Sequence, residues 1–164
     1  MDESPGFTDP LGHGRDETPE ARADRNFVEL LQGLRVAVTG VQVLFAFLLT
    51  VPFATGFEKV TDFQRDLYYV TLVSAAVASI FFIAPAAQHR ILFRQGMKES
   101  LTRRSNRYGL IGTLALAVSI TSATMLITDY IFRWELALAT AVPVGLLALW
   151  VWFIGPMIYR SRKS

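Results

Sequence analysis

The chain contains no cysteine and only two histidines in 164 residues. The lack of cysteine excludes disulfide bonds, thiolate chemistry and iron–sulfur ligation. Neither histidine has a second ligand at metal-binding spacing, no Ser-His-Asp set can be assembled, and no glycine-rich phosphate loop precedes a helix. We therefore expect neither an enzyme nor a bound cofactor or metal ion.

Charge is also scarce, since only 18% of the residues are charged and 52% are hydrophobic. Four stretches contain no Asp, Glu, Lys, Arg or His, and they cover residues 36–57, 67–87, 108–128 and 136–159. Each has at least the roughly 20 residues that an α-helix needs to cross a hydrocarbon core of about 30 Å. None carries along its whole length the polar stripe that a soluble helix turns to water. The sequence predicts an all-α integral membrane bundle of four transmembrane helices.

The basic residues indicate the orientation of these spans. Of the 16 Lys and Arg residues, only Lys59, Arg65 and Arg133 lie in the links after the first and third spans. The others lie in the amino-terminal segment, the link after the second span and the carboxyl tail. Because basic residues in short loops favour the cytoplasm, we predict a multi-pass protein of the cell (inner) membrane with both termini cytoplasmic.

The segments outside the spans have distinct compositions. Residues 1–26 are acidic and contain three prolines, which predicts a disordered cytoplasmic tail before a transmembrane domain at 27–159. Residues 160–164 form a short basic cytoplasmic tail. Before the first span, apolar residues recur on one helical face, which predicts a short amphipathic helix; they are Phe27, Leu30, Leu31, Leu34 and Val38.

The link after the second span, residues 88–107, is a basic cytoplasmic loop. Six cations suit the anionic headgroups of the inner leaflet, so membrane lipids are the expected partners. Nucleic acid is not expected, because membrane topology already accounts for these charges. The predicted headgroup contacts are Arg90, Arg94, Lys98, Arg103, Arg104 and Arg107.

The first span carries a polar stripe. Gln32, Arg35, Thr39 and Gln42 follow at spacings of three, four and three residues, which places them on one side of a helix. One interpretation is hydrogen bonding between helices. The other is a small polar pocket that opens to the cytoplasm near Gln88; its candidate residues are Arg35, Thr39, Gln42, His89 and Asn106.

Two further residues carry local predictions. Asp129, at the outer end of the third span, lies four residues before Arg133 and can pair with it on one helical turn, so we interpret it as a surface ion pair or a helix-end charge in preference to a gate. Pro143, about a third of the way into the fourth span, predicts a kink because it removes a backbone donor from the helix.

Two segments resemble a known family. They are residues 29–53, which read ELLQGLRVAVTGVQVLFAFLLTVPF, and residues 83–90, which read IAPAAQHR, followed downstream by Asn106-Arg107. Together they resemble a family of small four-span membrane proteins from actinobacteria that is known only as a domain of unknown function. The resemblance covers about residues 27–130. It implies four helices and supplies no substrate, cofactor or catalytic residue.

Two classes of function fit these observations. The first is a structural or interaction subunit that assembles as a homo-oligomer or with a larger membrane complex, and the lack of charge inside the spans favours it. The second is a small-solute channel or lipid-binding transporter that uses the polar stripe of the first span.

Overall fold

The computed structural model describes residues 19–92 and 98–161, and in these ranges the chain is helical, without strands. The long helices are α1 (Pro19–Thr50), α2 (Asp62–Leu92), α3 (Lys98–Ile131) and α4 (Trp134–Leu149). A π-helical segment, Trp150–Ile154, joins α4 to the short α5, Gly155–Ser161. Two 3₁₀ turns, Val51–Phe53 and Phe57–Lys59, connect α1 to α2.

Four helical segments are long and apolar enough to cross a membrane. They are Leu31–Phe53, Asp62–Gln88, Arg104–Ile131 and Trp134–Ser161. Each overlaps one of the four predicted spans, and the first lies about five residues earlier than predicted. The helix ends at Thr50 because Pro52 follows, and proline has no N–H to donate to the carbonyl of Leu48.

The helices continue beyond their apolar spans. Residues 19–26, assigned from the sequence to the disordered tail, form the first turns of α1, which is continuous with the first span. Pro19 suits a first helical position, and the Glu-Ala-Arg-Ala run that follows has high helix propensity. Likewise α2 extends to Leu92 and α3 begins at Lys98, both inside the predicted loop 88–107. The rest of the predicted tails, residues 1–18 and 162–164, lies outside the described residues.

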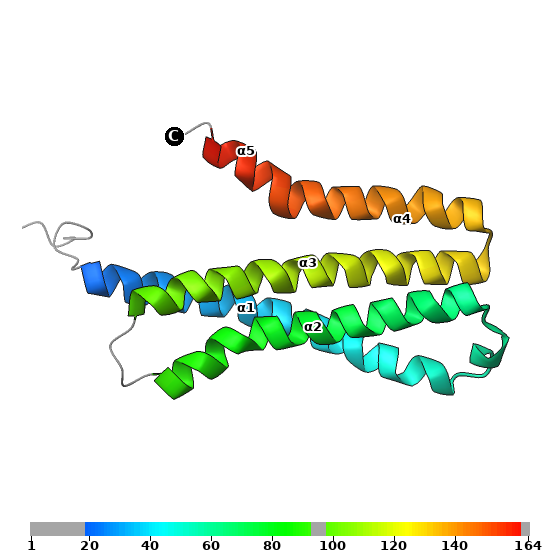
Figure 1. The fold of residues 1–164 in the computed structure, drawn as a ribbon, viewed down its shortest axis with the longest axis horizontal. Helices are drawn as coiled ribbons and strands as arrows, with labels where there is room; N and C mark the ends of the chain where they lie inside the picture. The colour runs from blue at the N-terminus through cyan, green and yellow to red at the C-terminus, as the bar shows by residue number, and fades with distance from the viewer. Residues whose placement is uncertain (1–18, 93–97, 162–164) are drawn as a thin grey trace, which may run out of the picture.

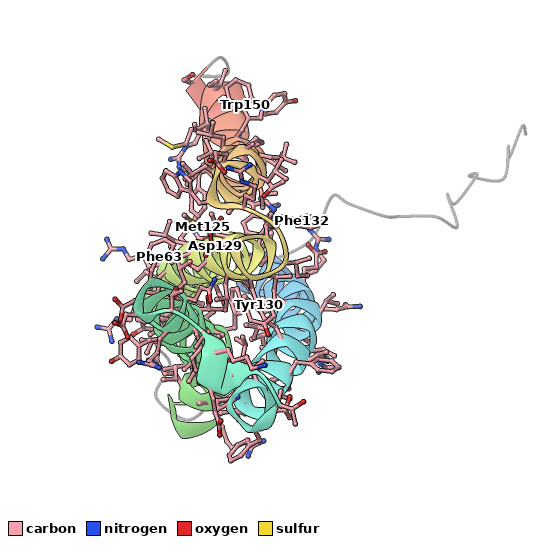
Figure 2. All side chains as sticks on the ribbon, turned by 90° about the vertical axis from the view of Figure 1, so that its right-hand side faces the viewer. Phe63, Met125, Asp129, Tyr130, Phe132 and Trp150 are labelled. Carbon is pink, nitrogen blue, oxygen red and sulfur yellow. The ribbon has the colours of Figure 1, made fainter. Side chains whose placement is uncertain are left out.

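The helices form an open arrangement in which α3 is central (Figure 1). The antiparallel α2 and α3 pack along most of their lengths, and α1 packs mainly on α2. α4 packs on α3, on the side away from α1 and α2, as the end view shows (Figure 2). The described ends of the chain, the carboxyl end of α2 and the amino end of α3 lie at one end of the molecule, and the α1–α2 and α3–α4 links lie at the other (Figure 1). We name these the inner and outer ends after the orientation that the basic residues predict.

Small residues let the central helices approach closely. Ala75 and Ala78 on α2 and Ser119 on α3 are fully buried. A Cβ atom built on Gly112 would lie 2.7 Å from the ring of Phe82, so glycine is required where α3 crosses this ring. The α3–α4 contact also uses small residues, because Ala137 and Ala141 are the buried residues of α4.

The bend in the last helix differs from the predicted kink at Pro143. The ribbon of α4 runs without a visible bend, and the chain changes direction at the π-helical segment before α5 (Figure 1). Pro156 lies just after this segment and cannot donate to the carbonyl of Trp152, four residues earlier. Just before this proline the chain forms a wider π-turn, in which the N–H of Gly155 donates to the carbonyl of Trp150, five residues earlier. The bend therefore lies where Pro156 interrupts the α-helical hydrogen bonds.

Candidate functional site

The polar stripe of the first span lies on an outward face of α1. Gln32, Arg35, Thr39 and Gln42 are all exposed. Gln42 is at the midpoint of the apolar segment Leu31–Phe53, which corresponds to a depth of about 15 Å in a bilayer. The stripe therefore runs from the inner boundary of the span to its centre.

The packing of α1 explains this orientation. Val41 and Leu48 are buried, with Val41 packed in one core cluster with Ala78 and Phe82 of α2. Leu34 lies seven residues before Val41 and approaches α3. A Cβ atom built on Gly109 of α3 would lie 3.7 Å from the Leu34 side chain. Residues spaced by seven lie on one side of a helix, so this side of α1 faces α2 and α3. The polar stripe lies on the other side.

The polar groups of the stripe differ in how they are satisfied. The Thr39 hydroxyl donates to the carbonyl of Arg35, one turn earlier, at 3.1 Å, so it needs no outside partner. In the part of the chain that the structure describes, the Gln42 amide has no hydrogen-bond partner. A primary amide offers two N–H donors and one acceptor oxygen. Gln42 is therefore the residue of this face with unused hydrogen-bonding capacity at mid-span.

The remaining pocket candidates lie on other helices. His89 is in α2, and its side chain is outside the described part of the structure. Asn106 is exposed on α3, three residues before Gly109, which is the α3 residue at the level of Leu34. Asn106 thus lies near the level of Gln32, at the inner end of the stripe.

The predicted headgroup contacts gather at the inner end. Arg90 on α2 and Arg104 and Arg107 on α3 are exposed. Lys98 and Arg103 belong to α3, but their side chains are outside the described part, and Arg94 lies outside the described residues. The three described guanidinium groups are free to extend into a headgroup layer at this end.

A second polar group at the inner end contains Gln88, near which the pocket was predicted to open, together with Tyr108 and Ser105, which were not predicted. The Gln88 amide nitrogen donates to the hydroxyl of Tyr108 at 3.1 Å, across α2 and α3. Among the residues that the structure describes, the amide oxygen of Gln88 and the hydroxyl of Ser105 are buried without a hydrogen-bond partner. Ser105 gave no signal in the sequence because it lies among charged residues of the predicted loop, and its burial follows only from the extension of α3 into that loop.

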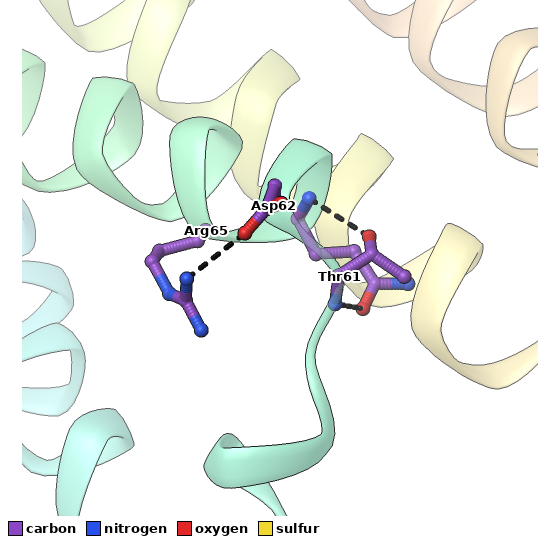
Figure 3. A network of polar contacts seen from close by, with 4 residues as sticks. Thr61, Asp62 and Arg65 are labelled. Carbon is purple, nitrogen blue, oxygen red and sulfur yellow. Dashed lines mark hydrogen bonds and ion pairs between the residues drawn. The ribbon is translucent and has the colours of Figure 1, made fainter.

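A third polar cluster lies at the outer end. The hydroxyl of Thr61 accepts from the N–H of Gln64 at 3.2 Å, and the Gln64 amide oxygen accepts from the N–H of Thr61 at 3.1 Å (Figure 3). This reciprocal pair is a capping box at the start of α2. Beside it, the exposed Arg65 pairs with Asp62 at 3.0 Å (Figure 3).

The same glutamine reaches α3. The Gln64 amide nitrogen donates to a carboxylate oxygen of Asp129 at 2.9 Å, and Gln64 is buried. The sequence prediction paired Asp129 with Arg133, but Arg133 lies after the end of α3 and contacts Glu135 instead, at 3.5 Å. The i, i+4 spacing holds only within a continuous helix, and α3 ends at Ile131. All members of this outer cluster are paired, and the Gln64–Asp129 bond joins the start of α2 to the end of α3.

Comparisons with known proteins give one match. A family model described as "Family of unknown function (DUF6328)" matches residues 16–156, which include the first three apolar segments and the fourth as far as residue 156. No curated protein matches. No solved structure matches either. The actinobacterial origin implied by the sequence resemblance stays a prediction.

Proposed function

Since the chain belongs to this family of unknown function, we propose a role from its own residues: it is an integral membrane protein that serves as a structural or interaction subunit of a membrane assembly. The observation that supports this role is the position of Gln42. Its amide lies at the midpoint of an apolar helix, on a face that the described helices leave exposed.

The energetic argument concerns the surroundings of that amide. A polar group in hydrocarbon without a hydrogen bond costs on the order of several kcal/mol. Lipid tails offer no donor or acceptor, so the favourable surroundings for Gln42 are another protein surface with polar groups at the same depth. A subunit role provides such a surface and requires no catalytic residue.

The proposed setting is the cell (inner) membrane, with both termini in the cytoplasm. Both described ends of the chain lie at the inner end, as an even number of spans requires (Figure 1). Arg90, Arg104 and Arg107 are exposed near that end. Basic residues favour the cytoplasmic side and attract anionic lipids of the inner leaflet, which are the proposed lipid partners.

A second candidate role is a small-solute channel or a lipid-binding transporter. The observation that favours it is the run of exposed polar residues from Gln32 to Gln42, with Asn106 near the level of its inner end. A solute that moves along this stripe would need a second protein surface opposite it, because the stripe lies on an outward face of the single chain. An assembly is therefore required by this role as well.

Native mass spectrometry of the protein, extracted gently from its own membrane, tests the subunit role. We expect a fixed homo-oligomer or a second protein in constant stoichiometry. Gln42→Leu should reduce this association. Val43→Leu, at the next exposed position and the same depth, is the matched control and should leave it intact. A monomer that carries one specific lipid or small molecule, lost in Gln42→Leu, would replace the subunit role with the second candidate.

A further inference from the structure

The stripe belongs to a longer row of exposed positions on α1. These positions are spaced alternately by four and three residues, and they are Val28, Gln32, Arg35, Thr39, Gln42, Ala46 and Leu49. An average spacing of 3.5 residues is that of a left-handed coiled coil, in which such a row forms the seam with a partner helix. We call this row the α1 seam.

The seam differs from the rest of the exposed surface of α1. It contains every polar residue from Gln32 to Gln42, whereas the exposed residues beside it from Gly33 to Phe47 are apolar or glycine: Gly33, Val36, Gly40, Val43 and Phe47. The one polar neighbour nearer the end of the helix, Thr50, has its hydroxyl bonded to the carbonyl of Phe47. A lipid-facing surface needs no polar residues. The segregation of polar residues onto one row at 3.5 spacing therefore indicates contact with a helix.

We propose that the α1 seam binds the α1 seam of a second copy of this chain, as a parallel left-handed helix pair about a two-fold axis. This inference rests on the proposed subunit role and names the partner. Two copies in one membrane have the same orientation, so each seam residue meets its own counterpart at the same depth. An amide is self-complementary, because each Gln42 can donate to and accept from the other.

The residues around Gln42 fit this pairing. Ala46, one turn further along the seam, is small and lets the two backbones approach. Thr39 has its hydroxyl already bonded to the Arg35 carbonyl, so it presents a methyl group and no unsatisfied donor. Arg35 lies only four residues inside the span, about 6 Å from its inner boundary, where the two guanidinium groups can extend outward to lipid phosphates.

The absence of cysteine from the chain gives a direct test by disulfide cross-linking. Single cysteines are placed at Thr39 and Ala46, on the seam, and at their sequence neighbours Gly40 and Phe47, which are equally deep and also exposed. In native membranes treated with copper phenanthroline, we expect cross-linked dimers at the seam positions, at least about fivefold more than at their neighbours. Equal cross-linking at all four positions, or none at any, would overturn the pairing.

A second measurement addresses the amide itself. In lipid nanodiscs or mild detergent, Gln42→Leu should weaken self-association by roughly tenfold, because it removes the hydrogen bonds between the two amides. Val43→Leu should leave self-association unchanged. The subunit role and the homodimer would be contradicted by different results. If native mass spectrometry finds a second protein in constant stoichiometry while the seam cysteines do not cross-link, the homodimer is wrong and the subunit role stands. If only monomers are found by both methods, both are wrong.

Discussion

The hydroxyl of Tyr68 on α2 donates a hydrogen bond of 3.0 Å to the carbonyl of Leu48 on α1, and both residues are buried. In an uninterrupted α-helix, the N–H of residue 52 would bond to this carbonyl, but residue 52 is proline. Tyr68 thus replaces the backbone donor that Pro52 removes. The end of α1 is thereby fixed against α2 by a side chain.

Tyr68→Phe should lower the free energy of unfolding by about 1–3 kcal/mol, because it leaves the Leu48 carbonyl buried without this donor. The measurement is a denaturation titration in mixed detergent micelles, followed by tryptophan fluorescence. Tyr69→Phe is the matched control, since Tyr69 is the next residue and is 66% exposed. In a Pro52→Ala background, which restores a backbone N–H, the cost of Tyr68→Phe should shrink. An unchanged cost in that background would contradict the compensation.

Glycine-to-alanine substitutions should change stability differently on the packed surface of α3 and on the exposed surface of α1. Gly112→Ala should destabilise the fold by about 1–3 kcal/mol, because the new Cβ would lie 2.7 Å from the ring of Phe82, which is itself buried. Gly40→Ala should be neutral or stabilising by up to about 1 kcal/mol, because nothing lies within 4 Å and alanine favours helix. The same unfolding titration measures both. Equal effects would contradict the close contact at Gly112.

The sequence predicted the spans because charge is excluded from hydrocarbon, so each apolar stretch is bounded by ionisable residues. It did not predict the beginning of α1 at Pro19 or the extension of α3 to Lys98, since these turns depend on helix propensity in polar sequence. The polar stripe was predicted from its spacing. Its outward direction was not, because that depends on which side of α1 contacts α2 and α3, and the contact residues Val41 and Leu48 are apolar like the exposed Val43, Phe47 and Leu49 of the same helix.

Side-chain partners between distant residues were the hardest feature to predict. Gln64 and Thr61 are recognisable as a capping box from their spacing alone, but the second bond of Gln64, to Asp129, joins residues on different helices. The bond exists because the outer ends of α2 and α3 lie side by side. A single sequence gives the order of the helices and not this register.

Two serines on α3 provide a comparison of satisfied and unsatisfied hydroxyls. Ser119 and Ser105 are both fully buried. The Ser119 hydroxyl donates to the Thr71 carbonyl on α2 at 2.9 Å, whereas the Ser105 hydroxyl has no partner within residues 19–92 and 98–161. Ser119→Ala should cost about 0.6–1.7 kcal/mol, the usual range for such bonds in membranes. Ser105→Ala should be neutral or stabilising, because it removes a buried hydroxyl that makes no bond. A clear loss of stability in Ser105→Ala would instead show that this hydroxyl has a partner in the membrane, such as a water molecule.

The outer cluster should stabilise the link between the two hairpins. Gln64→Met keeps the side-chain length but removes the amide oxygen that accepts from Thr61 and the amide nitrogen that donates to Asp129. We therefore expect the free energy of unfolding to fall by about 1.5–3 kcal/mol. Arg65→Gln breaks only the exposed pair with Asp62 and should cost at most about 1 kcal/mol. Unfolding titrations of Gln64→Met and Arg65→Gln measure the two losses of stability. Equal losses would show that the bond to Asp129 contributes nothing measurable.

The proposed orientation predicts which positions a membrane-impermeant thiol reagent can reach in intact cells. Single cysteines at Thr55, in the α1–α2 link, and at Arg133, in the α3–α4 link, are exposed at the outer end and should be labelled from outside. Cysteines at Asn106 and Ser161, exposed near the inner end, should be labelled only after the membrane is permeabilised. The inverse pattern would place the basic inner end outside the cell, and the positive-inside argument would then fail for this chain. Labelling of one outer link but not the other would mean that one of the apolar helices does not cross the membrane.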